Sequence, residues 1–415
     1  MSAIQDTEVL VLGAGPVGLF SALWLSERGV RVTIVDKYQR SALHSYALAL
    51  HPLTLRMLDE LGLAEALVEH GHPLERIAIY ENETRVAEIE LSALGGSFPL
   101  VLVLPQLLLE AALEKRLEEN GVQVLWGHQL LTFDDDQDAV TALVGRMPPD
   151  GNPSDPSEPP TVSTSRIRSS FLIAADGSDS LARRTLGVEC TNVGSPIHYG
   201  LLEFQSTLQS PEQMSLVIRD ESTDVLWPIG ADRGRWSVQL QDLSRPPDAA
   251  SLKERIGRRA PWFEADASTT DWITTVSFQR GLAERFGRGR VWLAGDAAHG
   301  ASPIGVQSMN VGFHEAYDLV RRMTDILRKN ASFELLRYYN EERSREWKML
   351  LGITNRLRMR PETPKWAQRL ALRLVPSLPA SGRDLNALLG QVGLRLHWLR
   401  RKTRLATTYQ PAHFD

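Results

Sequence analysis

The chain has 415 residues, of which 43% are hydrophobic and 23% charged, and its formal net charge at pH 7 is −5. This is the composition of a soluble globular protein with room for two or three domains, and its acidic balance gives no reason to expect nucleic acid as a partner. The single cysteine, Cys190, excludes a disulfide framework and a thiolate metal cluster, so we expect no metal site and a reducing, cytoplasmic setting. A strand is predicted close to the N-terminus, which leaves no room for a signal peptide, and no apolar run reaches the ~20 residues that span a bilayer.

The first predicted elements are a strand and a helix joined by glycines. Residues 8–18 read Glu-Val-Leu-Val-Leu-Gly-Ala-Gly-Pro-Val-Gly. Gly13 permits a tight turn, Gly15 lets the backbone approach a pyrophosphate, and Gly18 lets helix and strand pack closely. Pro16 fits the first helical turn, where its missing N–H costs nothing. The helix N-terminus then offers N–H groups to a phosphate.

An acid ends the next predicted strand, which covers residues 31–36. Asp36 can accept both hydroxyls of an adenosine ribose, and we include the adjacent Lys37 among the contact residues. Strand, glycines, helix, strand and acid follow one another within about 30 residues, which predicts a dinucleotide-binding unit. These residues alone leave open whether the dinucleotide is NAD or FAD.

Helices and strands alternate through the next part of the chain. We predict helices over 52–61 and 106–120, and strands over 77–80, 86–90, 99–104, 122–126, 128–133 and 139–145. Residues 147–165 contain six prolines and cannot join a strand ladder or a helix. We interpret them as a mobile hairpin tip at the surface.

Two further strands each end in an acid. Residues 170–176 end at Asp176, and residues 290–294 lead into Gly295 and Asp296. A carboxylate at the carboxyl end of a strand points into the crevice where α/β sheets bind ligands. Asp296 can accept a ribityl hydroxyl, and the helix predicted over about 310–329 can stabilise negative charge on a flavin ring.

These three motifs, in this order and spacing, resemble those of the class A flavoprotein monooxygenases, the aromatic hydroxylases of the para-hydroxybenzoate hydroxylase type. The resemblance covers about residues 7–330. It implies an α/β fold: a Rossmann-like FAD-binding domain of the glutathione reductase type, an inserted β-sheet substrate domain and a helical C-terminal region. We expect the FAD-binding domain at 1–74, 105–187 and 286–360, the β-rich substrate domain at 75–104 and 188–285, and a basic helical segment at 361–415.

The resemblance also implies the chemistry. It implies one non-covalent FAD, NADH or NADPH as a transient co-substrate, and a C4a-hydroperoxyflavin that passes one oxygen atom from O2 to an aromatic or polyketide-like apolar substrate. It ties Asp176 to FAD and nicotinamide handling, Asp296 to the ribityl chain and Pro303 to the isoalloxazine ring. The expected cofactor-binding residues are Gly13, Gly15, Pro16, Gly18, Asp36, Lys37, Gln106, Asp176, Gly295, Asp296, Pro303, Gly305 and Asn310.

The chain departs from the family pattern at three places. Tyr46 aligns with a position that is often arginine. Where the family usually has Gly-Gly-Gln-Gly-Met-Asn, this chain reads Gly305-Val-Gln-Ser-Met-Asn310, so Val306 and Ser308 replace two glycines beside the flavin. These side chains bear on hydride-transfer geometry more than on FAD binding. The chain also ends too early for the thioredoxin-like domain of the phenol hydroxylase branch.

A catalytic base, if the reaction uses one, should face the flavin from the β-rich module. His198, Tyr199 and Arg219 are the candidates. We interpret His299, which follows the third motif, as a structural histidine at the strand–helix turn.

The aromatic residues of the β-rich module leave two interpretations open. Trp227, Trp236 and Trp272 either line an apolar substrate pocket or, more commonly for strand residues, pack a β core.

The charge distribution leaves a further question open. Residues 351–405 have a net charge of +10, so the remainder of the chain has −15. Helices predicted over 365–375 and 384–398 have basic, amphipathic faces. They either lie on an anionic membrane surface or pack over the acidic body of the protein, and we favour packing. The chain could be a monomer or a homodimer.

Two functions other than a monooxygenase fit the same sequence. One is a flavin-dependent reductase of carbon–carbon double bonds. The other is a redox-silent protein in which FAD is structural and a ligand is bound or shaped. Oxygen uptake with NADH that rises when substrate is added would separate the monooxygenase from the reductase. FAD that stays oxidised under anaerobic NAD(P)H would indicate the redox-silent protein.

Overall fold

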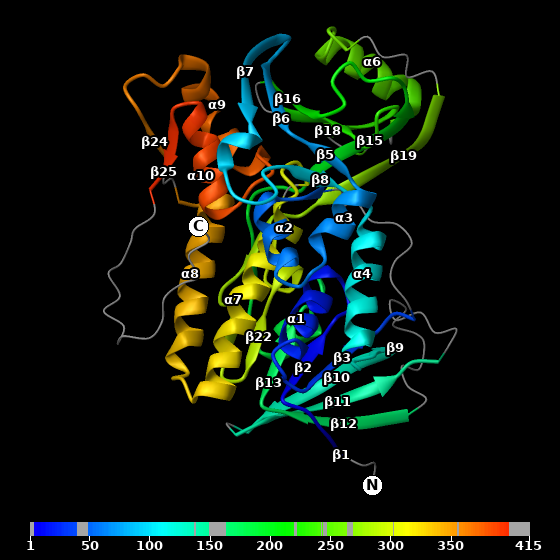
Figure 1. The fold of residues 1–415 in the computed structure, drawn as a ribbon, viewed down its shortest axis with the longest axis vertical. Coiled ribbons are helices and arrows are strands. Elements are labelled where there is room, and N and C mark those ends of the chain that lie inside the picture. Colours follow the sequence, from blue (N-terminus) through cyan, green and yellow to red (C-terminus); the bar gives the residue numbers. More distant parts are fainter. Residues whose placement is uncertain are drawn as a thin grey trace.

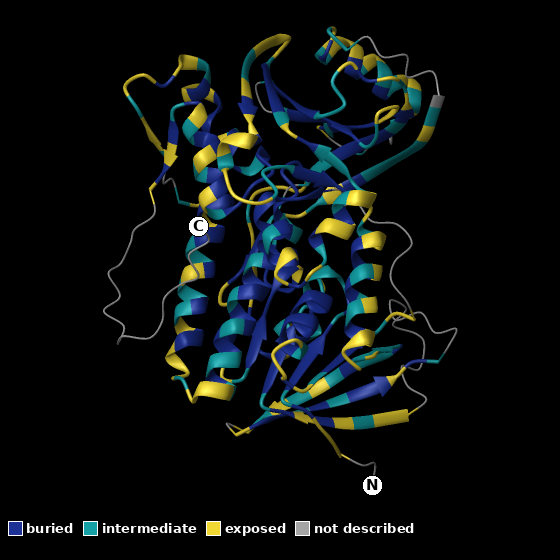
Figure 2. Cartoon of the chain, in the orientation of Figure 1, coloured by how far each residue is buried: buried dark blue, intermediate teal, exposed yellow. Residues whose placement is uncertain are grey.

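The structure is a computed structural model that describes residues 4–39, 49–136, 138–148, 163–219, 222–241, 243, 247–263, 269–301, 303–354 and 357–397. Figure 1 shows a lower body, in which helices stand beside a central sheet, and an upper body rich in strands. Buried residues are concentrated where the central sheet meets α1 (Pro16–Ser26) and α7 (Gln307–Lys329), as Figure 2 shows. Tyr46 lies outside the described residues.

The central sheet has six strands in the order β21-β22-β13-β2-β3-β9. All neighbours from β22 to β9 are parallel, and β21 pairs antiparallel at one edge. The unit β2–α1–β3 is the one predicted from the glycine motif. The strands are β2 (Val9–Leu12), β3 (Val32–Asp36), β9 (Val124–Trp126), β13 (Phe171–Ala174), β21 (Gly287–Arg288) and β22 (Val291–Leu293).

Four long helices stand side by side along this sheet in the order α4, α1, α7 and α8 (Figure 1). They bury apolar faces against one another and against the sheet, which makes the parallel strands β2, β13 and β22 buried along their whole length. α7 begins three residues before the predicted start at 310. The other two helices are α4 (Gln106–Glu119) and α8 (Glu334–Leu350).

A second, four-stranded sheet has the order β1-β12-β11-β10. β11 and β12 form an antiparallel pair whose register joins Arg146 to Ser163, so the proline-rich stretch connects two hairpin strands as predicted. The prediction that all of 147–165 stays out of a ladder was wrong at its end, because β12 begins at Ser163. Residues 149–162 lie outside the described residues. The strands are β1 (Ile4–Asp6), β10 (His128–Asp135), β11 (Val140–Arg146) and β12 (Ser163–Ser169).

The upper body is built on a seven-stranded sheet in the order β19-β15-β18-β17-β16-β6-β7. Two of its strands come from the segment before α4, and β6 pairs parallel with β16. Helix α6 (Ala249–Arg259), which the sequence analysis did not predict, covers the outer face through Leu252 and Ile256. The strands are β6 (Arg76–Glu81), β7 (Thr84–Glu90), β15 (Ile197–Gln205), β16 (Gln213–Arg219), β17 (Ser222–Pro228), β18 (Arg233–Leu240) and β19 (Thr269–Phe278).

Two further sheets have three strands each, with the orders β4-β8-β5 and β14-β20-β23. In the second of them, β20 pairs with both β14 and β23. β14 comes just before β15 in the chain and β20 just after β19, so this sheet joins the two ends of the β15–β19 segment to the stretch that follows the third motif. The strands are β4 (Ala49–Leu50), β5 (His72–Leu74), β8 (Val101–Val103), β14 (Cys190–Asn192), β20 (Gly281–Ala283) and β23 (His299–Gly300). The short helices are α2 (Pro52–Asp59), α3 (Ala64–His70), η1 (Leu91–Leu94), α5 (Leu181–Thr185) and η2 (Gly295–Ala297).

The C-terminal segment packs its apolar side against the rest of the protein. Buried residues of α9 (Lys365–Ser377) and α10 (Gly382–Gln391) belong to the main hydrophobic core, and Arg369 bonds to Glu81 at 2.6 and 2.9 Å. This is the packing that we favoured over a membrane-facing surface. In the described part of the chain, no helix is both long and apolar enough to cross a membrane.

The second C-terminal helix is shorter than predicted. The expected helix over 384–398 ends at Gln391, because Gly393 has a φ of +80° and turns the chain into β25 (Leu394–Leu396). β25 then pairs antiparallel with β24 (Leu357–Met359). The helix was predicted too long because the apolar residues keep a helical spacing past Gly393. Only the structure shows that this glycine has a left-handed backbone conformation, which ends the helix.

Glu315 on α7 joins three elements inside the core and has no exposed surface. Its Oε2 accepts hydrogen bonds from the Gly295 N–H at 3.0 Å and from His299 Nε2 at 2.8 Å, and its Oε1 accepts one from Trp347 Nε1. The His299 ring also stacks on Trp347 with 3.7 Å between centroids. His299 is therefore held by protein groups, as its interpretation as a structural histidine requires.

We expect Glu315→Gln to lower the free energy of unfolding by about 2–4 kcal/mol, because an amide N–H₂ would face donors where the carboxylate accepts three hydrogen bonds. Urea unfolding monitored by circular dichroism measures the loss. Glu254→Gln is the matched control, since Glu254 lies on the surface in a pair with Arg258 and its loss should cost less than about 1 kcal/mol. Equal losses in the two variants would contradict the assignment.

Candidate functional site

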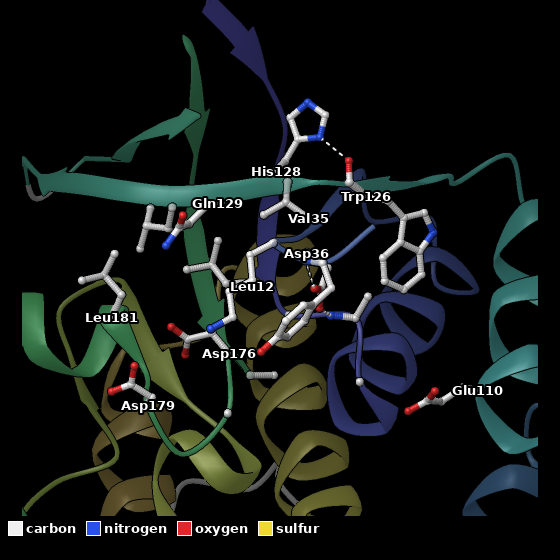
Figure 3. A pocket seen from close by; sticks show the side chains of 18 of the residues that line it. Leu12, Val35, Asp36, Glu110, Trp126, His128, Gln129, Asp176, Asp179 and Leu181 are labelled. Carbon is white, nitrogen blue, oxygen red and sulfur yellow. Dashed lines mark hydrogen bonds between the residues drawn. The ribbon is translucent and has the colours of Figure 1, made fainter. Parts of the chain in front are cut away.

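A cavity of about 600 Å³ opens at the carboxyl ends of β2, β3 and β13. Figure 3 shows Asp36, the last residue of β3, and Asp176, two residues beyond β13, beside the same space, with Leu12 close by. Gln106 and Glu110 of α4 form another part of its wall. The lining residues are Leu12, Gly13, Ala14, Gly15, Val35, Asp36, Lys37, Tyr38, Gln106, Glu110, Trp126, His128, Gln129, Leu130, Ala175, Asp176, Gly177, Asp179, Leu181 and Arg184.

The three glycines of the first motif have the local geometry that their predicted roles need. Gly13 has a φ of +93°, and a Cβ there would collide with the carbonyl oxygen of Ala175. A Cβ on Gly18 would collide with the carbonyl oxygen of Gly13. A Cβ on Gly15 would meet nothing within 4 Å, so this stretch of backbone is open to the cavity. A phosphate can therefore approach the N-terminus of α1 without a side chain in between.

Asp36 is fixed at the end of β3 by two backbone N–H groups. Its Oδ2 accepts from Ala14 at 2.6 Å and its Oδ1 accepts from Tyr38 at 2.8 Å. Burial raises the pKa of Asp36, and these two N–H groups oppose the rise. The carboxylate is thereby joined to the glycine turn and keeps lone pairs for ribose hydroxyls.

Asp176 follows β13 and lies at the start of α5. Its Oδ2 accepts from the Ala182 N–H at 3.2 Å, while its Oδ1 is buried and has no hydrogen-bond partner among the described residues. Burial raises the pKa of Asp176. A buried oxygen without a donor is costly, so it calls for a ligand or water to complete the site. The open Gly15 backbone and this oxygen both fit a bound dinucleotide.

The third motif packs against the first. Gly295 has a φ of +63°, and a Cβ there would press on Val17 in the first turn of α1 at 3.1 Å. Asp296 is exposed, and its Oδ1 accepts from Ser308 Oγ at 2.5 Å. Ser308, one of the two residues that replace family glycines, thus contacts the carboxylate expected to bind the ribityl chain.

The expected cofactor residues fall into two groups. Gly13, Gly15, Asp36, Lys37, Gln106 and Asp176 line the 600 Å³ cavity. The other expected residues are not among those that line this cavity. Two of them, Pro16 and Gly18, are in the first turn of α1. Gly295, Asp296, Pro303, Gly305 and Asn310 belong to the segment from η2 to α7.

Asn310 has a structural position. Its Nδ2 donates to the carbonyls of Ala49 and Val306, both at 2.9 Å. Its Oδ1 accepts from the His51 N–H and from Thr54 Oγ1, both at 2.8 Å. Because Asn310 is buried and both ends of its side chain are engaged, the side chain holds the turn before α7, and its expected part in cofactor binding stays a prediction.

A second, much smaller cavity lies where the turn before α7 meets the inner face of the seven-stranded sheet. Pro303 and Val306 line it from one side. Arg235 faces it from β18, with its Nε donating to Glu203 at 2.8 Å. The lining residues are Leu201, Trp227, Arg235, Ser237, Val276, Phe278, Pro303 and Val306.

Two of the three candidate bases lie on the wrong face of this sheet. His198 and Gly200 are two residues apart on β15, so they face the same side of the sheet. A Cβ on Gly200 would contact Leu252 of α6, so this side is the outer face. Arg219 donates to Glu83 and to the carbonyl of Arg258, at the end of α6. We therefore withdraw His198 and Arg219.

Tyr199 faces inward, where its ring contacts Phe278. Trp227 lines the small cavity and Trp236 packs under α6, so the tryptophans divide between the two interpretations. The sequence analysis missed Arg235 and its cross-strand partner Glu203. The alternation of residues along each strand puts Glu203 and Arg235 on the inner face of the sheet. Only the pairing of β15 with β18 places the two side chains next to each other.

Comparisons with known proteins agree with this geometry. A model of the family described as "FAD binding domain" matches residues 6–351. The 6-methylpretetramide 4-monooxygenase of Streptomyces rimosus is 32% identical over 342 residues, which cover 81% of this chain and 59% of that protein. The pentachlorophenol 4-monooxygenase of Sphingobium chlorophenolicum is 25% identical over 396 residues, covering 89% of this chain and 70% of that protein. This chain therefore spans about three-fifths of the length of the Streptomyces relative.

A solved structure shows that the fold is shared. The crystal structure of p-nitrophenol 4-monooxygenase from Pseudomonas putida DLL-E4 superposes with a TM-score of 0.71 at 21% identity. The match covers 94% of this chain and 95% of that chain.

We expect Asp36→Ala to weaken FAD binding by about 10- to 100-fold, because hydrogen bonds to a charged group contribute about 1.5–3 kcal/mol. Titration of the apoprotein with FAD, followed by flavin fluorescence, measures the dissociation constant. Asp179→Ala is the control, because Asp179 lines the same cavity but is exposed and paired with Arg184. A dissociation constant that stays unchanged in Asp36→Ala would remove Asp36 from the binding site.

His51 makes stability depend on pH. Its Nε2 lies 2.8 Å from the Gly305 carbonyl, and burial lowers the pKa of His51 to about 3 despite that hydrogen bond. The unfolded chain takes up this proton near its ordinary pKa of about 6.5, so the contribution is present above pH 6.5 and is lost as the pH falls toward 3. Between pH 7 and 5 we expect His51 to remove about 2 kcal/mol from the free energy of unfolding.

Urea unfolding of the wild type and of His51→Gln at both pH values measures this loss. Glutamine can still donate to the Gly305 carbonyl but does not titrate, so its loss of stability should be smaller. The same pH dependence in both proteins would show that His51 titrates normally.

Proposed function

Because the chain belongs to the FAD binding domain family of class A aromatic hydroxylases, we propose that it is an FAD-dependent monooxygenase that consumes NADH or NADPH. It inserts one oxygen atom from O2 into an aromatic or polyketide-like apolar substrate. The observation that supports this most is the convergence of the three motifs around the N-terminus of α1, with the turn of the third motif facing a sheet-lined cavity. Residues 75–104 and 188–285 then form the substrate domain.

Each part of the FAD site has a role in this proposal. The glycine turn and the α1 N-terminus bind the pyrophosphate, Asp36 accepts the ribose hydroxyls, and Asp296 accepts a ribityl hydroxyl. Pro303 orients the ring system. These residues would hold FAD, which when bound would supply the redox chemistry of hydride acceptance from a nicotinamide and activation of O2.

The space beneath the inner face of the seven-stranded sheet is the proposed substrate site. It includes the small cavity, which has about 20 Å³ of free space, and a cavity of about 500 Å³ lined by Tyr199, Ile304 and Gln307 among others. The walls of the small cavity are mostly apolar, which helps to exclude water from the reacting groups.

Arg235 is held in place by Glu203, and its guanidinium lies 5.6 Å from the Trp272 ring centroid. A guanidinium so fixed binds an oxygen substituent of the substrate, such as a phenol or enol.

A coupled assay tests the proposed reaction. FAD-loaded protein is mixed with NADH or NADPH and a panel of phenols and polyketides under ¹⁸O₂. We expect substrate to stimulate NAD(P)H oxidation and one ¹⁸O atom to appear in the product. A reduced carbon–carbon double bond without O2 uptake would indicate the reductase, and FAD that stays oxidised would indicate the redox-silent protein.

A variant separates substrate binding from cofactor chemistry. Arg235→Met should raise KM for the active substrate by about tenfold or more, because it removes a charge-assisted hydrogen bond of about 1.5–3 kcal/mol. FAD affinity, measured by titration of the apoprotein, should stay at the wild-type value. An unchanged KM would place the substrate elsewhere.

A further inference from the structure

The cavity of about 500 Å³ beneath the seven-stranded sheet is large enough for a small-molecule ligand. Strands of the sheet, the turn before α7, the end of α8 and one side of α9 form its walls. Leu372 of α9, which is 65% exposed, belongs to this lining, and so do the buried Ile304 and Gln307. The cavity therefore leads from the protein surface to the turn that carries Pro303.

Most of this wall is apolar, but it also contains two positive charges. Arg280 lies between β19 and β20, and Arg373 lies on α9. Among the described residues that line the cavity there is no aspartate or glutamate. The apolar side chains are Pro196, Ile197, Ala301, Ile304, Leu350, Leu351, Leu372 and Pro376.

The two guanidinium groups have no acidic partner within the described ranges of the chain, whereas other arginines around the same sheet are paired. These pairs are Arg219–Glu83, Arg235–Glu203, Arg259–Asp224 and Arg369–Glu81. A partly buried guanidinium without a counter-charge favours an anion beside it. The cavity is therefore suited to a ligand that carries a negative charge.

Arg280 is fixed in place at the edge of the cavity. Its backbone carbonyl accepts from the Val193 N–H at 2.9 Å. A Cβ on Gly194 would lie 2.8 Å from Arg280 Nη2, so the guanidinium lies against that stretch of backbone. Its Nε is buried and has no hydrogen-bond partner among the described residues. A buried N–H without an acceptor calls for one from a ligand or water.

We propose that this cavity binds an aromatic substrate through an acidic group, and that Arg280 and Arg373 select a carboxylate. The planar fork of a guanidinium matches the two oxygens of a carboxylate. The aromatic part of the substrate then lies against Tyr199 and Ile304, next to the turn of Pro303. This rests on the proposed function only in identifying the ligand of the cavity as the substrate.

Calorimetric titration of the FAD-loaded protein tests this with two pairs of probes, each an acid and its uncharged amide. The pairs are 4-hydroxybenzoate with 4-hydroxybenzamide, and 6-hydroxy-2-naphthoate with 6-hydroxy-2-naphthamide. In the wild type at least one acid should bind about tenfold or more tightly than its amide, because hydrogen bonds between two charged groups are the stronger ones.

Variants of the two arginines should lower this preference for the acid. Arg280→Gln and Arg373→Gln should each reduce the ratio of the two dissociation constants at least about threefold. Arg280→Lys and Arg373→Lys keep the charge without the planar fork, so their ratios should lie between the wild-type and glutamine values. Arg369→Gln is the matched control, since Arg369 lies one helical turn before Arg373 but pairs with Glu81, and its ratio should stay within about twofold of the wild type.

Three results would overturn the inference. These are equal binding of acids and amides in the wild type, an unchanged ratio in both glutamine variants, and an equal change in Arg369→Gln. Melting temperatures check the fold, and those of the glutamine variants should stay within a few degrees of the wild type because no ion pair with a described residue is lost.

A nicotinamide nucleotide is a second source of negative charge, and the same variants distinguish it. The dissociation constants of NAD⁺ and NADP⁺ should be the same in Arg280→Gln and Arg373→Gln as in the wild type. Weaker nucleotide binding together with an unchanged acid-to-amide ratio would assign the arginines to the nucleotide and refute the inference.

This test separates the inference from the proposed reaction, because binding is measured without turnover. A preference for acids that depends on both arginines, in a protein that consumes no NAD(P)H, would refute the proposed reaction and leave the inference standing. Substrate-stimulated NAD(P)H oxidation without any preference for acids would refute the inference alone.

Discussion

The close approach of three strand ends to the first turn of α1 is the constraint on which the rest of the structure depends. It requires three positions without a side chain. A Cβ on Gly13 or Gly295 would collide with or press on another motif, and a Cβ on Gly18 would collide with the carbonyl oxygen of Gly13. The N-terminus of α1 then stands open to the cavity while acids from other strands surround it. In the proposed function this arrangement forms a phosphate site from segments almost 300 residues apart in sequence, and neither acid needs to be strongly exposed to reach it.

The same constraint explains how charge is managed at the site. Burial raises the pKa of both Asp36 and Asp176, because it disfavours the charged form of a carboxyl group. Backbone N–H groups of the glycine turn and of α5 accompany these carboxylates and favour the ionised form. In the proposed function the acids then serve as acceptors for hydroxyl groups, and the positive end of α1 is left to the phosphates.

Sequence patterns predicted the parts of the molecule in which local rules decide the structure. The unit β2–α1–β3 follows from buried strand, glycines and acid, and the edges of most predicted strands agree within a few residues. The patterns could not supply pairing between distant strands. His198 and Arg219 were misplaced because the side of a strand that faces the flavin depends on where α6 packs, and Arg235 meets Glu203 only through the β15–β18 pair. The helix over 384–398 was drawn too long because apolar spacing does not show which glycine adopts positive φ.

The two substitutions in the third motif act on different groups, although they lie two residues apart. Ser308 is turned toward Asp296 and bonds to it, so it acts on the carboxylate expected to meet the ribityl chain. Val306 is turned toward the inner face of the sheet, so it acts on the space beside Pro303. Val306 has the left-handed backbone conformation and directly precedes α7, which begins at Gln307. The bonds of Gln307 to the end of α9 hold the turn before α7 in place, so the basic C-terminal segment, whose apolar side is buried, contributes to the shape of the site without lining the FAD cavity.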